Sequence, residues 1–466
     1  MHRSTGRVFV AVCLFGLVGL LAPTVRAQGK GDADAFESEE GAPVKPSPVL
    51  APAIPASPSD DTAAVVKSAP VQSKPARTGP SAEAGLPGWI WGPPAPHVTS
   101  GLDWHGNLEL DGGYVKYSWA GAYVPETVYD SRGRFVLGPM FTRDLGNDYF
   151  LRVTGQVVAW VREDLNYYQI NADDVYVQVG QQGLWDFMAG RFLTWRVFRK
   201  GLGFDLYTLE DTGARTIPNF SDSSGWFQHP YEVNTIFMRD GGTPEVPSGR
   251  AAFHLYPNAW SGIELVGSYG RLQSGGNVLG GRLAAGIKQK YFNVLVGAEY
   301  ETWTPAQQQS QTDQSTGISV PCDQCGKEKK YGVGGSLALT PMQAIEIGVS
   351  AADGKHDIAE DVTTYAHKYD ETRSYGGYAQ LDVGSLVMAP ISLIVGGSWF
   401  HTEYSDEDGL YQRHDQYAGY VAYPLGFNNA VAKLVVSKAT GHQEHRQDPV
   451  VDAEMYSVRL RFAYYY

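Results

Sequence analysis

The 466-residue sequence carries 50 acidic and 37 basic side chains, which gives a formal net charge of −13 at pH 7. A chain this acidic is a poor partner for nucleic acid, whose phosphates attract basic surfaces. Its three cysteines supply no disulfide framework, and its 54 glycines and 28 tyrosines are a composition typical of strands and turns more than of helices.

The first 27 residues have the pattern of a secretory signal peptide. His2, Arg3 and Arg7 precede an apolar run over 8–21, and Ala27 precedes the expected cleavage site. The run is shorter than the roughly 20 apolar residues that a spanning helix needs. No later stretch offers 18 uninterrupted apolar residues, so we expect an exported chain without helical membrane spans.

Residues 28–100 form the second expected unit, a disordered linker in the periplasm. The stretch "APVKPSPVLAPAIPASPSDD" shows its Pro-rich and Ala-rich composition, which cannot bury enough apolar surface to fold. Near its end, Trp89 and Trp91 lie between prolines. They are suited to docking on a partner or plugging a pore, and equally to packing at the rim of the next unit.

Alternation of apolar and polar side chains dominates the third unit, residues 101–466. Leu151 and Val153, for example, alternate with Arg152 and Thr154, and a period of two is a strand signal. We expect strands near 104–119, 133–143, 149–162, 172–180, 183–193, 231–240, 249–257, 260–271, 279–290, 291–303, 329–340, 342–352, 373–384, 390–403, 414–424, 427–438 and 453–466.

Short and long connections alternate over the C-terminal half, as in barrels whose short turns face the periplasm. The long polar connections are expected at 304–328, 353–372, 404–413 and 439–452. Counted forward from a periplasmic linker, strand 183–193 runs outward. Counted backward from a periplasmic C-terminus, strand 231–240 also runs outward, and two successive strands cannot run in the same direction. One more strand is therefore expected within 194–230, for a total of about 18, an even number.

The last stretch, "YSVRLRFAYYY", has apolar or aromatic side chains at every second position. We expect lipid on one face, formed by Tyr456, Val458, Leu460, Phe462, Tyr464 and Tyr466, and water on the other, with Arg459 and Arg461. The stretch resembles the C-terminal signal by which the assembly machinery recognises Gram-negative outer-membrane barrels, with Tyr in place of the usual Phe or Trp. The resemblance implies an all-β transmembrane antiparallel barrel in the cell outer membrane, surrounded by lipid and lipopolysaccharide.

The stretch "ADDVYVQVGQQGLWDFMAGRFLTWRVFRKGLGFD", residues 172–205, resembles the porin hairpin that leads into a loop narrowing the pore. The resemblance implies that the loop folds inward and forms a constriction from Arg191, Arg196, Arg199, Lys200, Glu210 and Asp211. Opposed charges across a constriction would sort solutes by charge. Contact of the basic residues with lipopolysaccharide or solvent at the outer rim is the alternative.

Strand parity predicts which charged side chains line the interior. The basic ones are Arg152, Arg162, Arg282, Lys288, Lys433, Arg459 and Arg461, and the acidic ones are Asp186, Glu264, Glu299, Glu301, Glu346 and Asp382. The positive and negative charges of these two sets nearly balance. The additional basic residues of 191–200 give the lumen a net positive charge, which favours anions. A wide barrel with a charged interior encloses water, which predicts a conduit.

No metal site or cofactor is predicted. Cys322 and Cys325 are expected to form a local disulfide in a loop, because haem attachment would need His at position 326 and zinc would need further ligands. The loop 353–372 holds His356 and His367 but no EF-hand spacing, which favours a solvated acidic loop. No Ser/His or Asp/His set of the barrel enzymes is discernible, so we do not expect an enzyme.

Three functions are compatible with such a barrel. The first is secretion of a polysaccharide, because the cationic interior and strand number resemble alginate-type export barrels, and the 28–100 linker is suited to tethering periplasmic polysaccharide-export proteins. The second is a general or anion-leaning diffusion porin for small hydrophilic solutes. The third is a structural surface barrel in an adhesion or motility complex.

Overall fold

The computed structural model describes residues 98–119, 126–162, 167–201, 233, 248–271, 276–304, 309–312, 319–322, 327–342, 344–358, 369–387, 393–406, 409–425, 430–445 and 448–465. The predicted signal peptide and nearly all of the predicted linker lie outside the described residues. No helix within the described ranges is long and apolar enough to cross a membrane.

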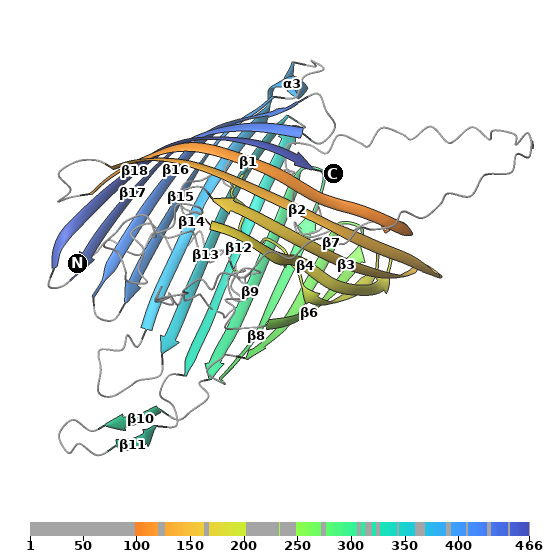
Figure 1. Cartoon of the computed structure of the whole chain (residues 1–466), viewed down its shortest axis with the longest axis horizontal. Helices are drawn as coiled ribbons and strands as arrows, with labels where there is room; N and C mark the ends of the chain where they lie inside the picture. The colour runs from red at the N-terminus through yellow and green to blue at the C-terminus, as the bar shows by residue number, and fades with distance from the viewer. Residues whose placement is uncertain are drawn as a thin grey trace, which may run out of the picture. The chain divides into compact units, whose positions relative to one another are not determined.

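Sixteen antiparallel strands form one closed barrel (Figure 1). They are β1 (Gly101–Trp119), β2 (Glu126–Gly146), β3 (Tyr149–Arg162), β4 (Tyr167–Gln181), β5 (Trp185–Arg191), β6 (Ser248–Asn258), β7 (Ser261–Arg271), β8 (Asn277–Lys288), β9 (Phe292–Thr304), β12 (Glu328–Met342), β13 (Ile345–Ile358), β14 (Tyr369–Asp382), β15 (Ile394–Asp406), β16 (Tyr411–Pro424), β17 (Ala430–His445) and β18 (Asp448–Tyr465). A separate two-stranded sheet, β10 (Gln309–Thr312) with β11 (Ser319–Cys322), and the four-residue helix α3 (Val383–Leu386) lie in connections.

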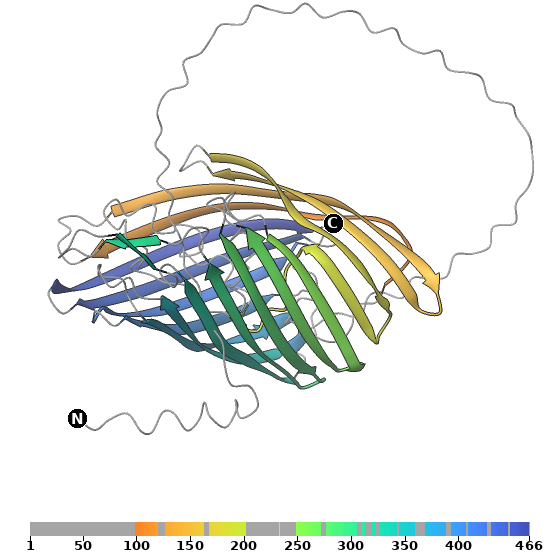
Figure 2. The same ribbon diagram turned by 90° about the horizontal axis from the view of Figure 1, so that it is seen from below.

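The barrel closes where β18 pairs with β1, so that the blue C-terminal strands lie beside the orange N-terminal ones (Figure 2). Leu110 faces Phe462 across this seam, and Gly113 faces Arg459. Closure leaves no sheet edge with unpaired backbone groups, which a strand in lipid cannot tolerate. The predicted all-β antiparallel barrel is confirmed.

Each strand has an apolar face turned outward and a second face turned inward. In β18, Leu460 is 56% exposed, whereas its neighbour Arg459 is 1% exposed. Tyr456, Val458, Phe462 and Tyr464 are also exposed, as the alternation predicts, and Tyr466 lies outside the described residues. An outward apolar face on a closed barrel is the arrangement that lipid requires.

The strand number is sixteen instead of about 18. β5 pairs directly with β6, where Phe187 faces Phe253, so no strand stands between them in the barrel. The strands expected at 231–240 and within 194–230 lie outside the described residues, apart from 194–201 and Val233. Of 231–240 only Val233 is described, and it is fully buried.

Some strands extend beyond their predicted ends into polar stretches that were expected to be loops. β17 and β18 run almost to each other, separated only by 446–447, where a loop over 439–452 was expected. His442 explains part of this extension, because its ring contacts Asp452 on the paired strand at 2.6 Å and Glu444 at 2.7 Å. Cross-strand pairs of this kind stabilise a polar ladder without apolar residues.

Candidate functional site

The chain leaves the barrel wall after β5 and enters the interior. Residues 192–201, called the internal segment below, have no regular secondary structure, yet Phe192, Trp195 and Val197 are fully buried. A buried backbone without strand partners must find hydrogen bonds elsewhere. The internal segment obtains them from side chains of the barrel wall.

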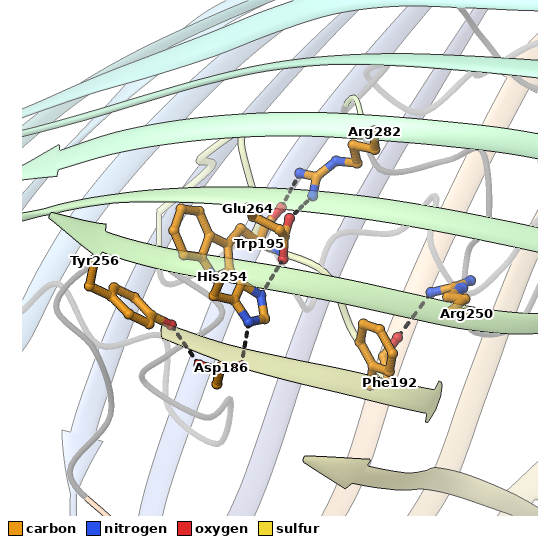
Figure 3. Close-up of polar contacts among 8 residues, drawn as sticks. All are labelled: Asp186, Phe192, Trp195, Arg250, His254, Tyr256, Glu264 and Arg282. Carbon is orange, nitrogen blue, oxygen red and sulfur yellow. Dashed lines mark hydrogen bonds and ion pairs between the residues drawn. The ribbon is translucent and has the colours of Figure 1, made fainter. Parts of the chain in front are cut away.

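The first anchor of the internal segment lies on β6, β7 and β8 (Figure 3). The Trp195 backbone N–H donates to both carboxylate oxygens of Glu264, at 3.1 and 3.0 Å. The Arg282 guanidinium donates to the Trp195 carbonyl and also pairs with Glu264. Arg250 donates to the Phe192 carbonyl at 2.9 Å. Side chains of the wall therefore bond to the N–H of Trp195 and to the carbonyl oxygens of Trp195 and Phe192.

A row of charged side chains lies behind this anchor. Asp186, His254 and Glu264 are register partners on β5, β6 and β7. The His254 ring contacts Asp186 through Nδ1 at 2.7 Å and Glu264 through Nε2 at 3.2 Å. The indole of Trp195 stacks on the His254 ring with centroids 5.5 Å apart. Since each of the three is at most 2% exposed, their charges must compensate one another.

The second anchor lies on β13 to β16. The Arg199 backbone N–H donates to Ser350 Oγ at 3.0 Å, and the Ser350 hydroxyl donates to the Arg199 carbonyl at 2.8 Å. The Phe198 ring packs on Phe400 of β15, with centroids 5.6 Å apart. Between the two anchors, Val197 lies against Gly297 of β9, so the internal segment follows the inner face of the barrel wall from β6 to β15.

Gly201 ends the described part of the internal segment under tight constraint. Its φ is +84°, a conformation that favours glycine. A Cβ placed on it would lie 3.0 Å from the Tyr378 ring and 3.0 Å from the Tyr420 hydroxyl. Glycine therefore allows the chain to lie against the aromatic side chains of β14 and β16.

A separate basic cluster lines the wall formed by β17, β18 and β1. Lys433 and Asp111 are both register partners of Arg461. Arg461 donates to the two oxygens of Asp111, at 2.6 and 2.5 Å, and lies 3.4 Å from Glu109. Arg459 lies over Gly113, where a Cβ would come within 2.8 Å of its side chain. All of these partners belong to the wall itself.

Most predicted lining residues with described side chains face inward and are buried. They are Arg152, Arg282, Lys433, Arg459, Arg461, Asp186, Glu264, Glu299, Glu301, Glu346 and Asp382. Lys288 is exposed at the end of β8, and the side chain of Arg162 is outside the described part. Their role in lining an open pore stays a prediction.

The predicted constriction residues fall in or beside the internal segment. Arg199 and Lys200 are buried in it, and Arg191 and Arg196 are partly buried. Glu210 and Asp211 lie outside the described residues, so the expected pairing with the basic residues stays a prediction. Arg199 and Lys200 are buried inside the barrel, whereas the alternative puts the basic residues in contact with lipopolysaccharide or solvent.

Sequence reasoning missed four residues of the two anchors. Arg250 and His254 had a usable signal, because they alternate with Ala251 and Phe253 along β6 as inward residues should. Trp195 and Ser350 had none, since their contacts join positions far apart in the chain.

The remaining sequence predictions concern cysteines and histidines. Cys322 ends β11, but Cys325 is outside the described residues, so the expected disulfide stays a prediction. His356 was assigned to a solvated loop, which is wrong: β13 extends to Ile358, and His356 is 3% exposed beside Glu328. Within the described ranges, no group of three or more His, Cys, Asp or Glu is arranged to hold a metal ion.

No family model and no curated protein matches the chain. Among solved structures, it is similar to OmpT of Vibrio cholerae (10% identity, 80% of this chain and 100% of that chain, TM-score 0.44). It is also similar to an anion-selective porin from Comamonas acidovorans (12%, 79% and 100%, TM-score 0.45) and to a mutant of Rh. blastica porin (12%, 78% and 100%, TM-score 0.38). The strand pairing of this chain itself shows a closed antiparallel β-barrel.

Proposed function

We propose that this chain is an outer-membrane channel for small hydrophilic solutes, narrowed by the internal segment. The observation that carries the proposal is the double anchoring of residues 192–201, on Glu264 and Arg282 at one part of the wall and on Ser350 at another. A segment fixed against the inner wall of a lumen reduces the space left for solutes and determines which side chains they meet.

Charge on the wall supports selectivity among small solutes. The arc from β17 through β3 carries the buried cations Lys433, Arg459, Arg461 and Arg152, against the carboxylates Glu109 and Asp111 that pair with Arg461. The opposite arc carries the carboxylates Asp186, Glu264, Glu299, Glu301 and Glu346 alongside Arg282, Arg250 and Lys330. A bias of positive charge on one side and negative charge on the other gives a transverse field, which acts on charged and dipolar solutes.

Export of a polysaccharide is the second candidate function. A cationic wall suits an acidic polymer, and tyrosines suit sugar rings. However, the inward aromatic side chains beside the internal segment, Tyr378, Tyr420 and Phe400, are at most 5% exposed. They pack on the segment and on neighbouring side chains, and Tyr420 donates to Gln380 at 2.8 Å. Because these surfaces are already occupied, the small-solute channel is the better supported function.

Conductance and secretion separate the two candidates. The full chain, refolded and inserted into a planar bilayer, is expected to give stable ohmic steps, and vesicles containing it are expected to admit small sugars but not oligosaccharides. Deletion of the gene is expected to leave surface polysaccharide unchanged. Loss of that polysaccharide on deletion would favour export, and a barrel without conductance would reject the channel. A barrel without conductance whose deletion impairs adhesion or motility would instead favour the structural alternative.

A further inference from the structure

Arg282 holds two parts of the chain that are distant in sequence. Its Nε donates to the Val233 carbonyl at 2.8 Å, and its terminal nitrogens reach the Trp195 carbonyl and Glu264. One guanidinium thus contacts the internal segment, residue 233 and the wall together. The planar fork of five donors makes arginine suited to this task.

The orientation of Arg282 depends on the charges of the row behind it. Glu264 is 0% exposed and faces both Arg282 and His254. His254 in turn faces Asp186, whose second oxygen accepts from the Tyr256 hydroxyl at 3.4 Å. Ionised carboxylates only accept hydrogen bonds, so an imidazole between two of them must carry a proton on each nitrogen. The row then alternates in sign as Asp186, His254, Glu264 and Arg282.

We propose that these four side chains form an acid-sensitive latch that holds the internal segment in the lumen. This inference rests on the proposed channel function. Protonation of Glu264 in acid removes the negative charge between His254 and Arg282 and leaves these two cations without their shared carboxylate. The Trp195 N–H then loses its charged acceptor, and such hydrogen bonds are roughly twice as strong as neutral ones.

The second anchor responds differently because the Ser350 hydroxyl does not titrate, and Glu346, a carboxylate that interacts with the Arg199 side chain, also accepts hydrogen bonds from Tyr378 and Gln380. Ser350 holds the backbone of Arg199 through neutral hydrogen bonds alone. Acid therefore releases the segment at Trp195 and not at Arg199. Arg250, which donates to the Phe192 carbonyl, is always charged and remains as a hinge at the start of the segment. The released segment shifts within the lumen and changes the conductance.

Conductance against pH tests the latch. Single channels of the full chain are recorded from about pH 7 down to about pH 2, below the ordinary carboxyl range, for the wild type and for Glu264→Gln. We expect an acid-dependent conductance state in the wild type, and the same state already at neutral pH in Glu264→Gln. Asp111→Asn is the matched control, since it removes a partly buried carboxylate that pairs with Arg461 on another part of the wall. Its acid response should persist.

Hydrogen exchange provides a readout that does not require a channel. At neutral pH, Glu264→Gln should exchange the amides of 192–201 at least about tenfold faster than the wild type, with the strand amides of β7 and β8 unchanged. Faster exchange without any conductance would keep the latch and reject the channel. A Glu264→Gln variant with wild-type exchange and a wild-type pH response would overturn the latch, as would a response equally lost in Asp111→Asn.

Discussion

Arg282 and Arg461 use the same chemistry to support different parts of the molecule. Each is a buried arginine paired with carboxylates, but the charged partners of Arg461, Asp111 and Glu109, both belong to the neighbouring strand β1. Arg282 shares its donors between Glu264 and the backbone of chain that has left the sheet. The first site stabilises the seam of the barrel, whereas the second positions an insertion. A buried ion pair on a barrel wall can therefore stabilise the wall itself or position a segment inside the barrel.

The largest expected effect comes from Glu264→Ala. It leaves Arg282 and His254 without their shared carboxylate, and breaking a buried pair in this way costs about 3–5 kcal/mol. Asp111→Ala should cost less, because Arg461 keeps Glu109 at 3.4 Å. Denaturant unfolding of the barrel in lipid vesicles measures both values. Equal losses in the two variants would remove the distinction between the two arginine sites.

A substitution on the outward face sharpens the description of the seam. Leu460 is 56% exposed in the middle of the outward run of β18. Leu460→Arg should cost about 2–4 kcal/mol if that face meets lipid, and Tyr456→Arg, nearer the boundary, about 0–1 kcal/mol. The same vesicle unfolding assay applies. A cost independent of depth would mean that this face of β18 is not in the membrane.

Ion selectivity tests the basic wall beside the seam. Lys433 is 2% exposed, faces inward and lies opposite Arg461. Lys433→Gln should move the reversal potential in a salt gradient toward cations, because the lumen loses a positive charge. Lys438→Gln, on the outward face of the same strand and paired with Glu454 at 2.7 Å, is the control. Shifts of equal size in the two variants would argue against a lumenal role for Lys433.

The smallest expected effect is that of Ser350→Ala at the second anchor. It removes two neutral hydrogen bonds, each of which contributes about 0.5–1.5 kcal/mol. Hydrogen exchange should accelerate around Arg199 and remain unchanged around Trp195. Global unfolding should shift little, in contrast to Glu264→Ala. A large global loss in Ser350→Ala would show that both anchors support the barrel itself.

The contrast between the two sites also explains what the sequence could predict. The inward position of Arg459 and Arg461 follows from alternation along a single strand, and so does that of Glu264 and Arg282. The placement of the internal segment in the lumen came from a resemblance alone, since its anchors join residues far apart in the sequence. Alternation predicts that Ser350 faces inward, but it does not predict the hydrogen bonds of Ser350 to Arg199.

The strand count shows a second limit of periodicity. The residues of 194–240 contain enough apolar alternation to suggest two strands, and a parity argument cannot distinguish adding a strand from removing one. Direct pairing of β5 with β6 decides the matter. In the described residues 192–201, burial inside the barrel accounts for apolar residues such as Phe192, Trp195 and Val197 without a strand ladder, so their pattern resembles that of a strand.

Disulfide trapping tests most directly whether the internal segment lies inside the barrel against its wall. A Cβ built on Gly297 of β9 would lie 2.8 Å from Val197 Cγ2, so Val197→Cys with Gly297→Cys brings two thiols within bonding reach. In a background with Cys322→Ser and Cys325→Ser, oxidation of native membranes should cross-link this pair. Val197→Cys with Gly112→Cys should not cross-link, because no atom lies within 4 Å of a Cβ there. Failure of the first pair in a folded barrel, or equal cross-linking of both, would contradict the placement of the segment.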